Sequence, residues 1–588
     1  MPHLQHPHGG RPQGNRRSPD RKRDLRVTDS STQTQDRFPL SRPALWLLLL
    51  LFTLVWFGTL NYRHLIASDE GRYAEMAREM LVSGDWITPR YDGYKYFEKP
   101  PLQTWMNALT FMWFGLGEWQ ARLWTALTGF GGTLLAGYTA KRVFNARTGL
   151  MTVLVLVGAP MWGLLGHFNV LDMGVTFMME ISLCAMLLAQ RPQLPRAQVR
   201  RWMWLCWAGM ALAVLSKGLI GIVLPGGVLV LYSLIARDWA VWKRAYIVSG
   251  LLIFLAISAP WFILVSIHNP EFAYFFFVDQ HFKRFLTDYA RREGPFYYFV
   301  PVLLVGFLPW VSVMWQTAAF TRKMPRQPNG FAPVTLLWVW TGFIFVFFSI
   351  SSSKLISYIL PIAPALAMLI GLYLSQLTAE RFKRHLAGYA VLLVLVTVLT
   401  AIFGARHGSA KNPLILYQEF RLWLYAAYAA AMFGIVLAWR LNRHSVRRAL
   451  IAFSAGMFAL AMIGGSGHEV FGRNSSGVLL VPAVKKVMAR LGPDTPFYSV
   501  GMLDHTMPFY LRHTMTMVAF EDELAFGISQ EPQKWIPTIP AFIKRWDSEP
   551  KALALISPPI YENLKNQHVP MQVIARDARR VIVEKPQP

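Results

Sequence analysis

The sequence predicts a mainly α-helical, polytopic membrane protein, in which about thirteen transmembrane helices form a bundle and a small α/β domain follows at the C-terminus. Three observations support this prediction. Hydrophobic residues make up 54% of the 588 positions and the mean hydropathy is +0.31, which is too apolar for a soluble chain of this length. Apolar windows of about 20 residues recur from Pro43 onward. Basic residues gather in short clusters between these windows.

The N-terminal segment differs from the rest of the chain. Residues 1–42 combine many arginines with Gln, Ser, Asp and Pro, a mixture that cannot bury enough apolar surface to fold. We therefore expect a disordered basic arm on the cytoplasmic side. The apolar run from Leu47 to Leu60 lacks a following small-residue cleavage site, so we expect it to remain as a membrane anchor.

Charge and cysteine content exclude several classes of protein. The net charge of +26 would suit nucleic-acid binding if the basic residues gathered on one soluble face. They lie instead in short clusters between apolar runs, where they indicate which loops are on the inner side of the membrane. We expect no nucleic-acid partner. Cys184 and Cys206, the only two cysteines, both lie in apolar runs. They can form neither a disulfide framework nor a cysteine zinc cluster, and we expect them to be small core residues.

Thirteen windows are predicted to cross the membrane: 43–61, 120–140, 148–167, 170–189, 203–219, 221–236, 245–267, 296–317, 333–350, 355–376, 386–404, 419–439 and 448–466. If the first window leaves the cytoplasm, every inner loop is basic, from Lys141, Arg142 and Arg147 onward, as the positive-inside rule requires. The apolar stretch 102–117 would reverse this alternation if it crossed. We therefore expect it to lie along the outer surface as an interfacial helix.

The expected outer parts are a first loop (62–119), an amphipathic loop (268–295) and a tail from about 467. Strand-like runs at 497–500, 515–519 and 581–583 alternate in the tail with helix-like pieces such as 482–491, where Pro482 suits a first helical turn. The predicted domains are therefore the arm at 1–42, a transmembrane catalytic domain at 43–466 and an external α/β domain at 467–588.

The first outer loop carries the most informative polar residues. Ser68 is placed to cap a helix whose first turn contains Asp69 and Glu70, where the helix dipole favours anions. One reading of this segment is a simple capping cluster. The other is a functional site, because Asp69, Arg72 and Tyr73 lie just beyond a membrane exit, where ionisable groups usually serve a function.

A second carboxylate, Asp172, lies at the outer end of an apolar helix, where an unpaired charge would be costly. A helix-start aspartate near water is the simpler reading. Convergence of Asp69 and Asp172 on one outer cavity is the reading that we favour, and it makes these two residues the candidate catalytic carboxylates.

Five ordered motifs carry a family resemblance: Ser68-Asp-Glu-Gly-Arg-Tyr, Glu98-Lys-Pro-Pro-Leu, Leu215-Ser-Lys-Gly, Gly294-Pro-Phe-Tyr-Tyr and Phe347-Phe-Ser-Ile-Ser-Ser-Ser-Lys-Leu-Ile-Ser-Tyr-Ile-Leu-Pro. Together they resemble the bacterial lipid A aminoarabinose transferases, relatives of the protein O-mannosyltransferases among the GT-C-type glycosyltransferases. The matches lie between about 40 and 370 and hardly touch the tail.

The resemblance implies a transfer of 4-amino-4-deoxy-L-arabinose from undecaprenyl phosphate to lipid A phosphate groups. This reaction modifies lipopolysaccharide and gives resistance to cationic antimicrobial peptides such as polymyxin. The resemblance also implies that the chain lies in the bacterial inner membrane, with the N-terminus in the cytoplasm and the C-terminal domain in the periplasm. The expected partners are the lipid-linked sugar, lipid A and membrane lipids, and we expect a monomer. The resemblance also marks Asp69 as the signature acidic residue of the first outer loop.

A polyprenyl-phosphate donor needs cations at the depth of its headgroup, because the leaving phosphate gains charge as the glycosidic bond breaks. The candidates at outer boundaries are Lys99, Arg72, Arg284, Lys354 and Lys217, each of which could instead be a snorkelling cation. Lys99 and Arg284 stand out, since Glu98-Lys-Pro-Pro and His281-Phe-Lys-Arg-Phe look like the family's contacts to the donor phosphate.

The remaining candidates have supporting roles. Tyr96 and Tyr358 could donate hydroxyl groups to the phosphate or could belong to the aromatic belt. Glu70, Tyr73 and Lys217 are the candidate substrate-positioning residues. We expect that no cofactor is required. If a divalent metal such as zinc binds, the carboxylate and imidazole groups to test as ligands are those of Glu98, His281 and His468, although their spacing forms no metal motif.

The acceptor decides the role of Asp69. A phosphate acceptor is already an anionic nucleophile, so Asp69 would orient the sugar and stabilise a positive anomeric centre, whereas a Ser or Thr hydroxyl would need Asp69 as a base. Direct displacement inverts the anomeric carbon in both cases.

The alternative functions for this sequence are a protein O-mannosyltransferase or related transferase, and a lipid transporter or flippase. We find no convincing internal repeat of the kind common in transporters.

Overall fold

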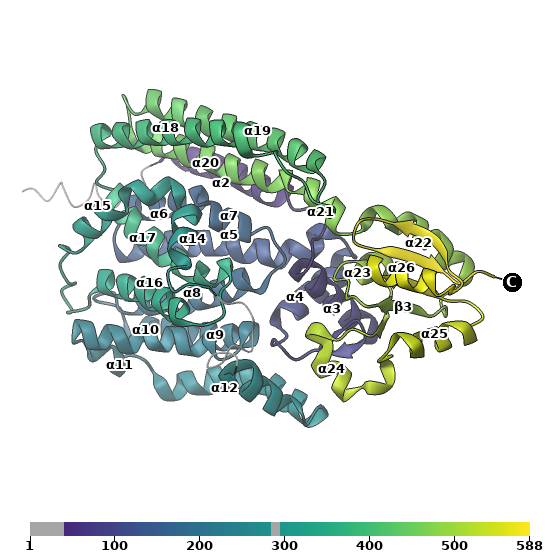
Figure 1. The fold of residues 1–588 in the computed structure, drawn as a ribbon. Coiled ribbons are helices and arrows are strands. Elements are labelled where there is room, and N and C mark those ends of the chain that lie inside the picture. The colour runs from purple at the N-terminus through teal and green to yellow at the C-terminus, as the bar shows by residue number, and fades with distance from the viewer. Residues whose placement is uncertain (1–39, 284–293, 588) are drawn as a thin grey trace, which may run out of the picture. The chain divides into compact units, whose positions relative to one another are not determined.

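The computed structural model describes residues 40–283 and 294–587, and in these ranges the chain is mainly helical, as predicted (Figure 1). The helices up to residue 467 are α2 (Arg42–Gly58), α3 (Asp69–Ser83), α4 (Leu102–Phe114), α5 (Glu118–Val143), α6 (Ala146–Gly158), α7 (Pro160–Leu165), α8 (Leu171–Ala189), α9 (Arg196–Lys217), α10 (Ile220–Ala236), α11 (Ala240–Lys243), α12 (Ile247–His268), η1 (Tyr274–Lys283), α14 (Phe299–Gly306), η3 (Leu308–Trp310), α15 (Val311–Thr321), α16 (Pro333–Ile350), η4 (Ile356–Ile362), α17 (Ala363–Leu374), α18 (Ala379–Phe403), α19 (Leu414–Leu441) and α20 (Val446–Gly467). Each predicted membrane window falls on one of these helices or on consecutive helical segments.

Fewer helices than predicted meet a strict criterion for crossing a membrane. Among the described residues, seven helices are long and apolar enough by length and composition, or eight if α14 and the segment 308–321 form one span bent by 82°. The apolar helices α2, α6 and α10 are shorter than 18 residues. A helix rises about 1.5 Å per residue, so each of these three would cross about 30 Å of hydrocarbon only with help from its neighbours. The count of thirteen therefore stays a prediction.

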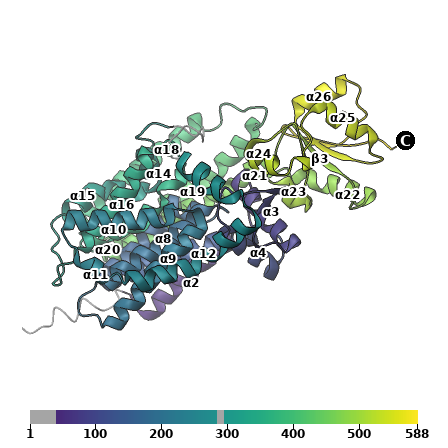
Figure 2. The ribbon, with the colours of Figure 1, turned by 90° about the horizontal axis from the view of Figure 1, so that it is seen from below.

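The membrane helices pack through small residues and apolar side chains. α9 lies beside α8, α10 and α12 (Figure 2), and α19 lies along α20. A Cβ atom on Gly434 of α19 would lie 2.6 Å from Cα of Gly456 in α20. Only glycine allows this approach, as is common between helices in membranes. Cys184 and Cys206 are free and buried, as predicted.

The first outer loop folds into two helices and a hairpin. Strands β1 (Arg90–Tyr91) and β2 (Tyr94–Lys95) pair antiparallel between α3 and α4. The expected helix within 102–117 is α4, whose C-terminal end exposes Met112, Trp113 and Phe114, while its position along a membrane surface stays a prediction. One expectation was wrong: Ser68 precedes α3, but its side chain makes no capping hydrogen bond.

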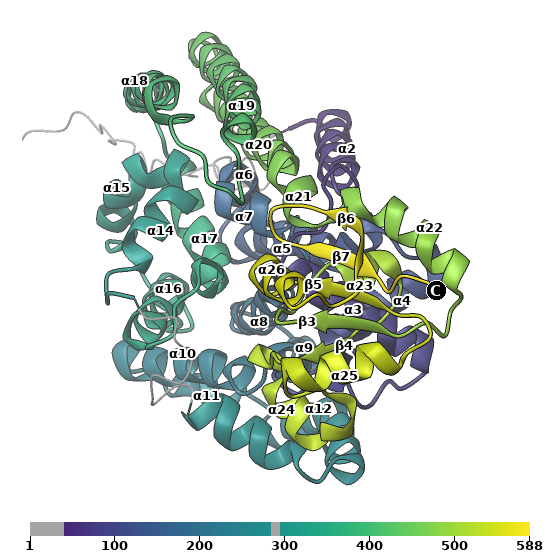
Figure 3. The same cartoon turned by 45° about the vertical axis from the view of Figure 1, so that its right-hand side comes forward.

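The C-terminal part contains α21 (Glu469–Ser475), η5 (Val478–Leu480), α22 (Val481–Leu491), β3 (Phe497–Val500), α23 (Met507–Leu511), β4 (Thr516–Val518), η6 (Asp522–Leu524), α24 (Ala525–Gln530), η7 (Pro532–Lys534), α25 (Ile539–Ser548), β5 (Leu553–Ile556), α26 (Pro558–Asn566), β6 (Gln572–Arg576) and β7 (Val581–Glu584). The strands form one sheet in the order β4-β3-β5-β7-β6 (Figure 3). β4, β3 and β5 are parallel, and β7 runs antiparallel to both β5 and β6.

The period-two pattern of the strands explains why both faces of this sheet are covered. Tyr498 and Val500 of β3 pack in one cluster with side chains of α25 and α26, whereas Phe497 packs in another with side chains of α22 and α23. The predicted strands near 497–500, 515–519 and 581–583 and the helix at 482–491 are therefore confirmed. The domain boundary at 467 stays a prediction.

The first outer loop and the sheet domain share one apolar cluster. It contains Tyr73, Met76, Tyr91, Tyr94 and Tyr96 of the loop together with Leu171, Leu503, Met517, Leu524 and Ile528. The two parts also approach closely at Gly71, where a Cβ atom would lie 2.1 Å from the carbonyl oxygen of His505. This packing fixes the loop that carries Asp69 against the C-terminal domain.

Candidate active site

Asp69 opens α3 and is the most accessible acidic group of that helix's first turn. Its side chain is 42% exposed, and its carboxylate forms an ion pair with Arg72, one helical turn later. Residues at i and i+3 share one helix face, which explains the pairing. The Asp69 carboxylate therefore combines a fixed cationic neighbour with access for a substrate.

Arg72 joins the first loop to the C-terminal domain. Its guanidinium is only 6% exposed and donates to Asp69, to Glu523 and to the Tyr96 hydroxyl, the last at 2.9 Å. Burial would lower the pKa of Arg72, but Tyr96, Tyr73, Glu523 and Asp69 raise it well above its ordinary value. Arg72 is thus a permanent buried cation.

Glu523 and His505 complete this group from the C-terminal domain. Burial raises the pKa of Glu523 to about 7, because desolvation and the nearby carboxylates outweigh Arg72. Burial and Arg72 lower the pKa of His505 to about 4, so its ring is neutral at pH 7. His505 Nδ1 lies 2.8 Å from the Tyr91 hydroxyl and 3.3 Å from Oε1 of Glu523. Because the ring is neutral, the second contact is not an ion pair.

Tyr73 of α3 lies within electrostatic range of three carboxylates. Burial raises the pKa of the Tyr73 phenol, Arg72 lowers it, and the charges of Asp69, Asp172 and Glu98 raise it further. These three carboxylates therefore lie close enough to interact with one hydroxyl group. Convergence of Asp69 and Asp172 on one cavity stays a prediction.

Asp172 is not unpaired. It lies in the first turn of α8, and its carboxylate accepts a hydrogen bond from the ammonium of Lys217 in the last turn of α9. The same ammonium lies 4.6 Å from the centre of the Tyr358 ring. Lys217 therefore neutralises a largely buried carboxylate and also contacts an aromatic ring.

A cavity of about 120 Å³ adjoins this pair. Its lining includes Glu98, Lys99, Lys217 and Tyr358, so the cavity wall combines cations, a carboxylate and a hydroxyl group. Lys99 donates to the carbonyl of Glu98 at 2.8 Å, and their charged groups are 3.8 Å apart.

Lys354, a predicted contact to the donor phosphate, does not line this cavity. Its buried ammonium donates to the carbonyl of Ser349 in the last turn of α16 and to that of Ser351 just after the helix.

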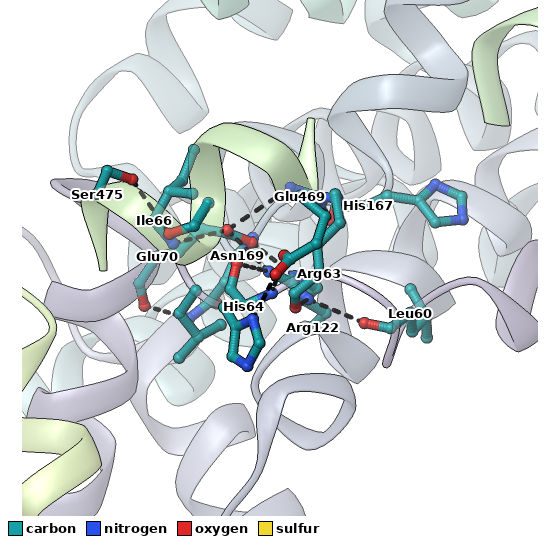
Figure 4. Close-up of polar contacts among 12 residues, drawn as sticks. Leu60, Arg63, His64, Ile66, Glu70, Arg122, His167, Asn169, Glu469 and Ser475 are labelled. Atoms are coloured by element: carbon teal, nitrogen blue, oxygen red, sulfur yellow. Dashed lines mark hydrogen bonds and ion pairs between the residues drawn. The ribbon is translucent and has the colours of Figure 1, made fainter. Parts of the chain in front are cut away.

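Glu70 points into a separate, fully buried network (Figure 4). Arg122 of α5 donates to both of its oxygens, at 2.7 and 2.9 Å, and the backbone N–H of Asn169 donates at 3.0 Å. Burial would raise the pKa of Glu70, but Arg122 lowers it, and the net pKa lies below its ordinary value. Arg122 also donates to the carbonyls of Leu60 and Arg63. This geometry gives Glu70 a task in holding the loop, while a contact with substrate stays a prediction.

The candidate metal ligands are not gathered in the described structure. Among residues 40–283 and 294–587, no group of three or more His, Cys, Asp and Glu side chains could hold a metal ion. Glu98 lines the cavity, whereas His468 packs beside Phe168 and Phe471. The side chain of His281 and all of Arg284 lie outside the described residues.

Comparisons with known proteins identify the family. A model described as the aminoarabinose transferase C-terminal domain matches residues 482–585, and one described as dolichyl-phosphate-mannose-protein mannosyltransferase matches residues 44–276. The undecaprenyl phosphate-alpha-4-amino-4-deoxy-L-arabinose arabinosyl transferase of Edwardsiella ictaluri is 32% identical over 422 residues, covering 66% of this chain and 75% of that protein. The chain belongs to this arabinosyl transferase family.

Solved structures of the arabinosyl transferase family agree over almost the whole chain. The crystal structure of ArnT from Cupriavidus metallidurans bound to undecaprenyl phosphate matches with a TM-score of 0.89 and 40% identity, covering 93% of this chain and 99% of that one. The apo structure of the same protein matches with a TM-score of 0.88 and 41% identity. This chain is accordingly a multi-pass membrane protein, and the expected mainly helical fold of this family is confirmed, whereas the number of spans stays a prediction.

Sequence reasoning missed Glu523, His505 and Arg122. Glu523 and His505 lie in the tail, where the resemblance hardly extends, and nothing local distinguishes them from surface residues. Arg122 carried a usable signal, because a cation at the start of a predicted membrane span is costly unless a carboxylate pairs with it.

Proposed function

We propose that this protein is an inverting, lipid-linked glycosyltransferase that moves 4-amino-4-deoxy-L-arabinose from undecaprenyl phosphate to a phosphate group of lipid A. The observation that carries the proposal is the match over 93% of the chain to ArnT bound to undecaprenyl phosphate. Two further observations support it: Asp69, Asp172 and Glu98 all act electrostatically on Tyr73, and Lys99 and Lys217 line one cavity. The modified lipopolysaccharide carries less negative charge and gives resistance to polymyxin.

In the proposed reaction, an oxygen of the lipid A phosphate attacks the anomeric carbon while the bond from that carbon to the donor phosphate oxygen breaks. Undecaprenyl phosphate leaves with the bonding electrons, so its negative charge increases. Lys99 and Arg284 stabilise that charge, with Arg72, Tyr96 and Tyr358 as further donors. Lys354 joins them only if its ammonium leaves the carbonyls of Ser349 and Ser351. The phosphate acceptor is already anionic and needs no general base.

Asp69 and Asp172 then act on the sugar. Their carboxylates stabilise the positive charge that develops at the anomeric centre, and Asp69 also attracts the cationic amino group of the sugar. Lys217 holds Asp172, Arg72 holds Asp69, and Glu70 holds the loop through Arg122, while Tyr73 is the candidate for positioning the substrate. No step passes through a metal, and Glu98, His281 and His468 remain the residues to test if one binds.

We place the site on the periplasmic side of the bacterial inner membrane. Thirteen spans, a cytoplasmic N-terminus, a catalytic domain at 43–466 and a periplasmic domain at 467–588 are consistent with the basic loops expected inside. Both substrates are lipids that reach the site laterally from the bilayer. We propose that the protein acts as a monomer.

The decisive experiment compares lipid A from cells that lack this protein with lipid A from cells that express it. Mass spectrometry should show an added aminoarabinose residue only in the expressing cells, and only when undecaprenyl phosphate-aminoarabinose is made. An unchanged lipid A mass with normal expression of the protein would refute the proposed acceptor.

A second candidate function is transfer of a sugar to a protein hydroxyl. The mannosyltransferase model that matches residues 44–276 favours it, because that region contains Asp69, Asp172 and Lys99. Incubating the purified protein with polyprenyl-phosphate mannose and a Ser/Thr-rich peptide tests this function: glycopeptide without modified lipid A would support it. Lipid flux without sugar transfer would instead indicate a flippase.

A further inference from the structure

A second cavity, of about 580 Å³, lies at the far end of α8 and α9 from Asp172 and Lys217. Asp172 is in the first turn of α8 and Lys217 in the last turn of α9, whereas the cavity is lined by residues just after α8 and at the start of α9. α8 has 19 residues and is therefore about 28 Å long, close to the thickness of a bilayer's hydrocarbon core. The two cavities thus belong to opposite membrane faces.

The lining of this cavity is strongly cationic. Arg191, Arg196, Lys243 and Arg244 contribute four positive charges, and no lining residue is acidic. In the described part of the chain, none of these four residues forms an ion pair with a carboxylate. The C-terminal dipole of α8 accounts for one nearby cation. It does not account for four cations drawn from three separate segments.

Arg191 and Arg244 are half-buried, are each held by one hydrogen bond to the protein, and keep further N–H groups that can bind a ligand. Arg191 donates from Nε to the carbonyl of Leu188 at 3.1 Å, and Arg244 donates from one terminal nitrogen to the side chain of Gln190 at 3.3 Å. Each guanidinium carries five N–H donors, so one such bond leaves most of them directed elsewhere. Pre-oriented guanidinium groups are well suited to phosphate.

The backbone around the cavity is also unusual. Gln193 and Tyr246, which both line it, adopt left-handed conformations with φ of 59° and 49°. Such conformations are uncommon for residues other than glycine. Tyr246 immediately precedes α12, whose neighbouring residues Ile247, Val248 and Leu252 are 46%, 79% and 64% exposed. An apolar, outward-facing helix surface therefore begins beside the cations.

We propose that this cavity binds the phosphate headgroup of an anionic phospholipid in the leaflet opposite the transfer site. The shared chemistry is a phosphate ester: Arg191 and Arg244 hold its oxygens, and Arg196 and Lys243 add charge. The exposed face of α12 favours a lipid over a soluble phosphate, because acyl chains can lie along it. Basic pockets between membrane helices on the cytoplasmic side commonly bind such headgroups.

Native mass spectrometry of the full-length protein in detergent tests this site, with phosphatidylglycerol, phosphatidylcholine and inorganic phosphate as probes. The wild-type protein should retain one phosphatidylglycerol more tightly than phosphatidylcholine. The Arg191→Gln/Arg244→Gln variant should bind phosphatidylglycerol at least tenfold more weakly. The matched control, Arg440→Gln/Arg443→Gln, removes the same charge outside the cavity and should stay within twofold of wild type.

Three outcomes would overturn the proposal: equal loss of lipid in both double variants, no loss in the cavity variant, or displacement of phosphatidylglycerol by an equal concentration of inorganic phosphate. The last outcome would assign the cavity to a soluble anion. Retained sugar transfer shows that each variant folds. If Arg191→Gln/Arg244→Gln does not fold, Arg196→Gln/Lys243→Gln replaces it, because both of those side chains are exposed.

Discussion

Arg72 of the first outer loop and Glu523 of the C-terminal domain form an ion pair, although 451 positions separate them in the sequence. The same guanidinium pairs with Asp69, so the C-terminal domain reaches the candidate catalytic carboxylate through one residue. The domain therefore contacts the candidate active site through Arg72, and we expect its loss to lower the transfer rate.

The first prediction concerns pH. The pKa of Glu523 is raised to about 7, so Glu523 is protonated below that pH and becomes a carboxylate that holds Arg72 above it. We expect the transfer rate to rise as pH increases through about 7, and Glu523→Gln to flatten this rise. Rates measured from pH 5.5 to 8.5 in proteoliposomes check this. A rise that persists unchanged in Glu523→Gln would assign the titration to another group.

The raised pKa of Glu523 gives the first prediction a second measurement. Whereas the transfer rate should rise with pH, the contribution of Glu523 to the stability of the fold should fall with pH. A carboxyl group whose pKa is higher in the folded state destabilises the fold as pH rises from its ordinary value toward the raised one. Between pH 5 and 7 we expect Glu523→Gln to gain thermal stability relative to wild type as pH increases. Thermal unfolding in detergent measures the difference, and a constant difference across this range would contradict the shift.

The second prediction concerns Asp69. Asp69→Asn removes a charge beside the developing positive centre and should lower kcat at least about 100-fold, with little change in thermal stability, because the side chain is 42% exposed. A reconstituted assay with undecaprenyl phosphate-aminoarabinose checks it. Glu562→Gln, in the half-exposed pair with Arg576, is the matched control and should keep full activity. Near-normal transfer by a folded Asp69→Asn would remove this residue from the mechanism.

The third prediction concerns the Asp172–Lys217 pair. Each partner is 13% exposed, so Asp172→Asn or Lys217→Met alone leaves a poorly hydrated charge without its counter-ion. We expect each single variant to lose at least about 30-fold in kcat/KM. The double variant should lose much less than the product of the two, because the partners act as a unit. Additive losses in this double-mutant cycle would show that the two groups act independently.

The fourth prediction concerns Glu70 and Arg122. Removing one member of a fully buried ion pair costs about 3–5 kcal/mol, so Glu70→Gln and Arg122→Gln should each lower the unfolding temperature clearly. Arg576→Gln, in the half-exposed pair, should cost less than about 1 kcal/mol. If Glu70→Gln kept its unfolding temperature but lost transfer, Glu70 would contact substrate instead of holding the loop.

The fifth prediction concerns the donor phosphate. Lys99 lines the cavity beside Lys217, and Lys99→Gln should raise KM for the lipid-linked sugar about tenfold with a smaller change in kcat. Lys565→Gln, on the exposed surface of α26, is the control. An unchanged KM in Lys99→Gln would move the phosphate contact to other cations.

Periodicity and charge were enough to predict the helices of the membrane windows, three of the five strands of the tail sheet and the helical nature of 102–117, whereas β5 and β6 were not predicted. Periodicity and charge could not fix the number of spans, because α2, α6 and α10 are short, and because α5 and α9 are long enough but are not among the helices apolar enough to cross alone. Asp69, Asp172 and Lys217 were found because charge near an apolar helix is locally costly. Glu523 and His505 were not found, because these side chains become buried only when the tail packs on the first outer loop. The prediction that the Ser68 side chain caps α3 was wrong, because the helix begins without a side-chain cap.

The contact between Gly71 and the carbonyl of His505 has a consequence for the timing of activity. A ribosome releases Asp69 and Arg72 early and Glu523 near the end of synthesis. While the chain is still being inserted, the loop of Asp69 lacks the surface of the C-terminal domain that packs against Gly71. We therefore expect activity to appear only after translation is complete, and chains that end before His505 to accumulate as inactive membrane proteins.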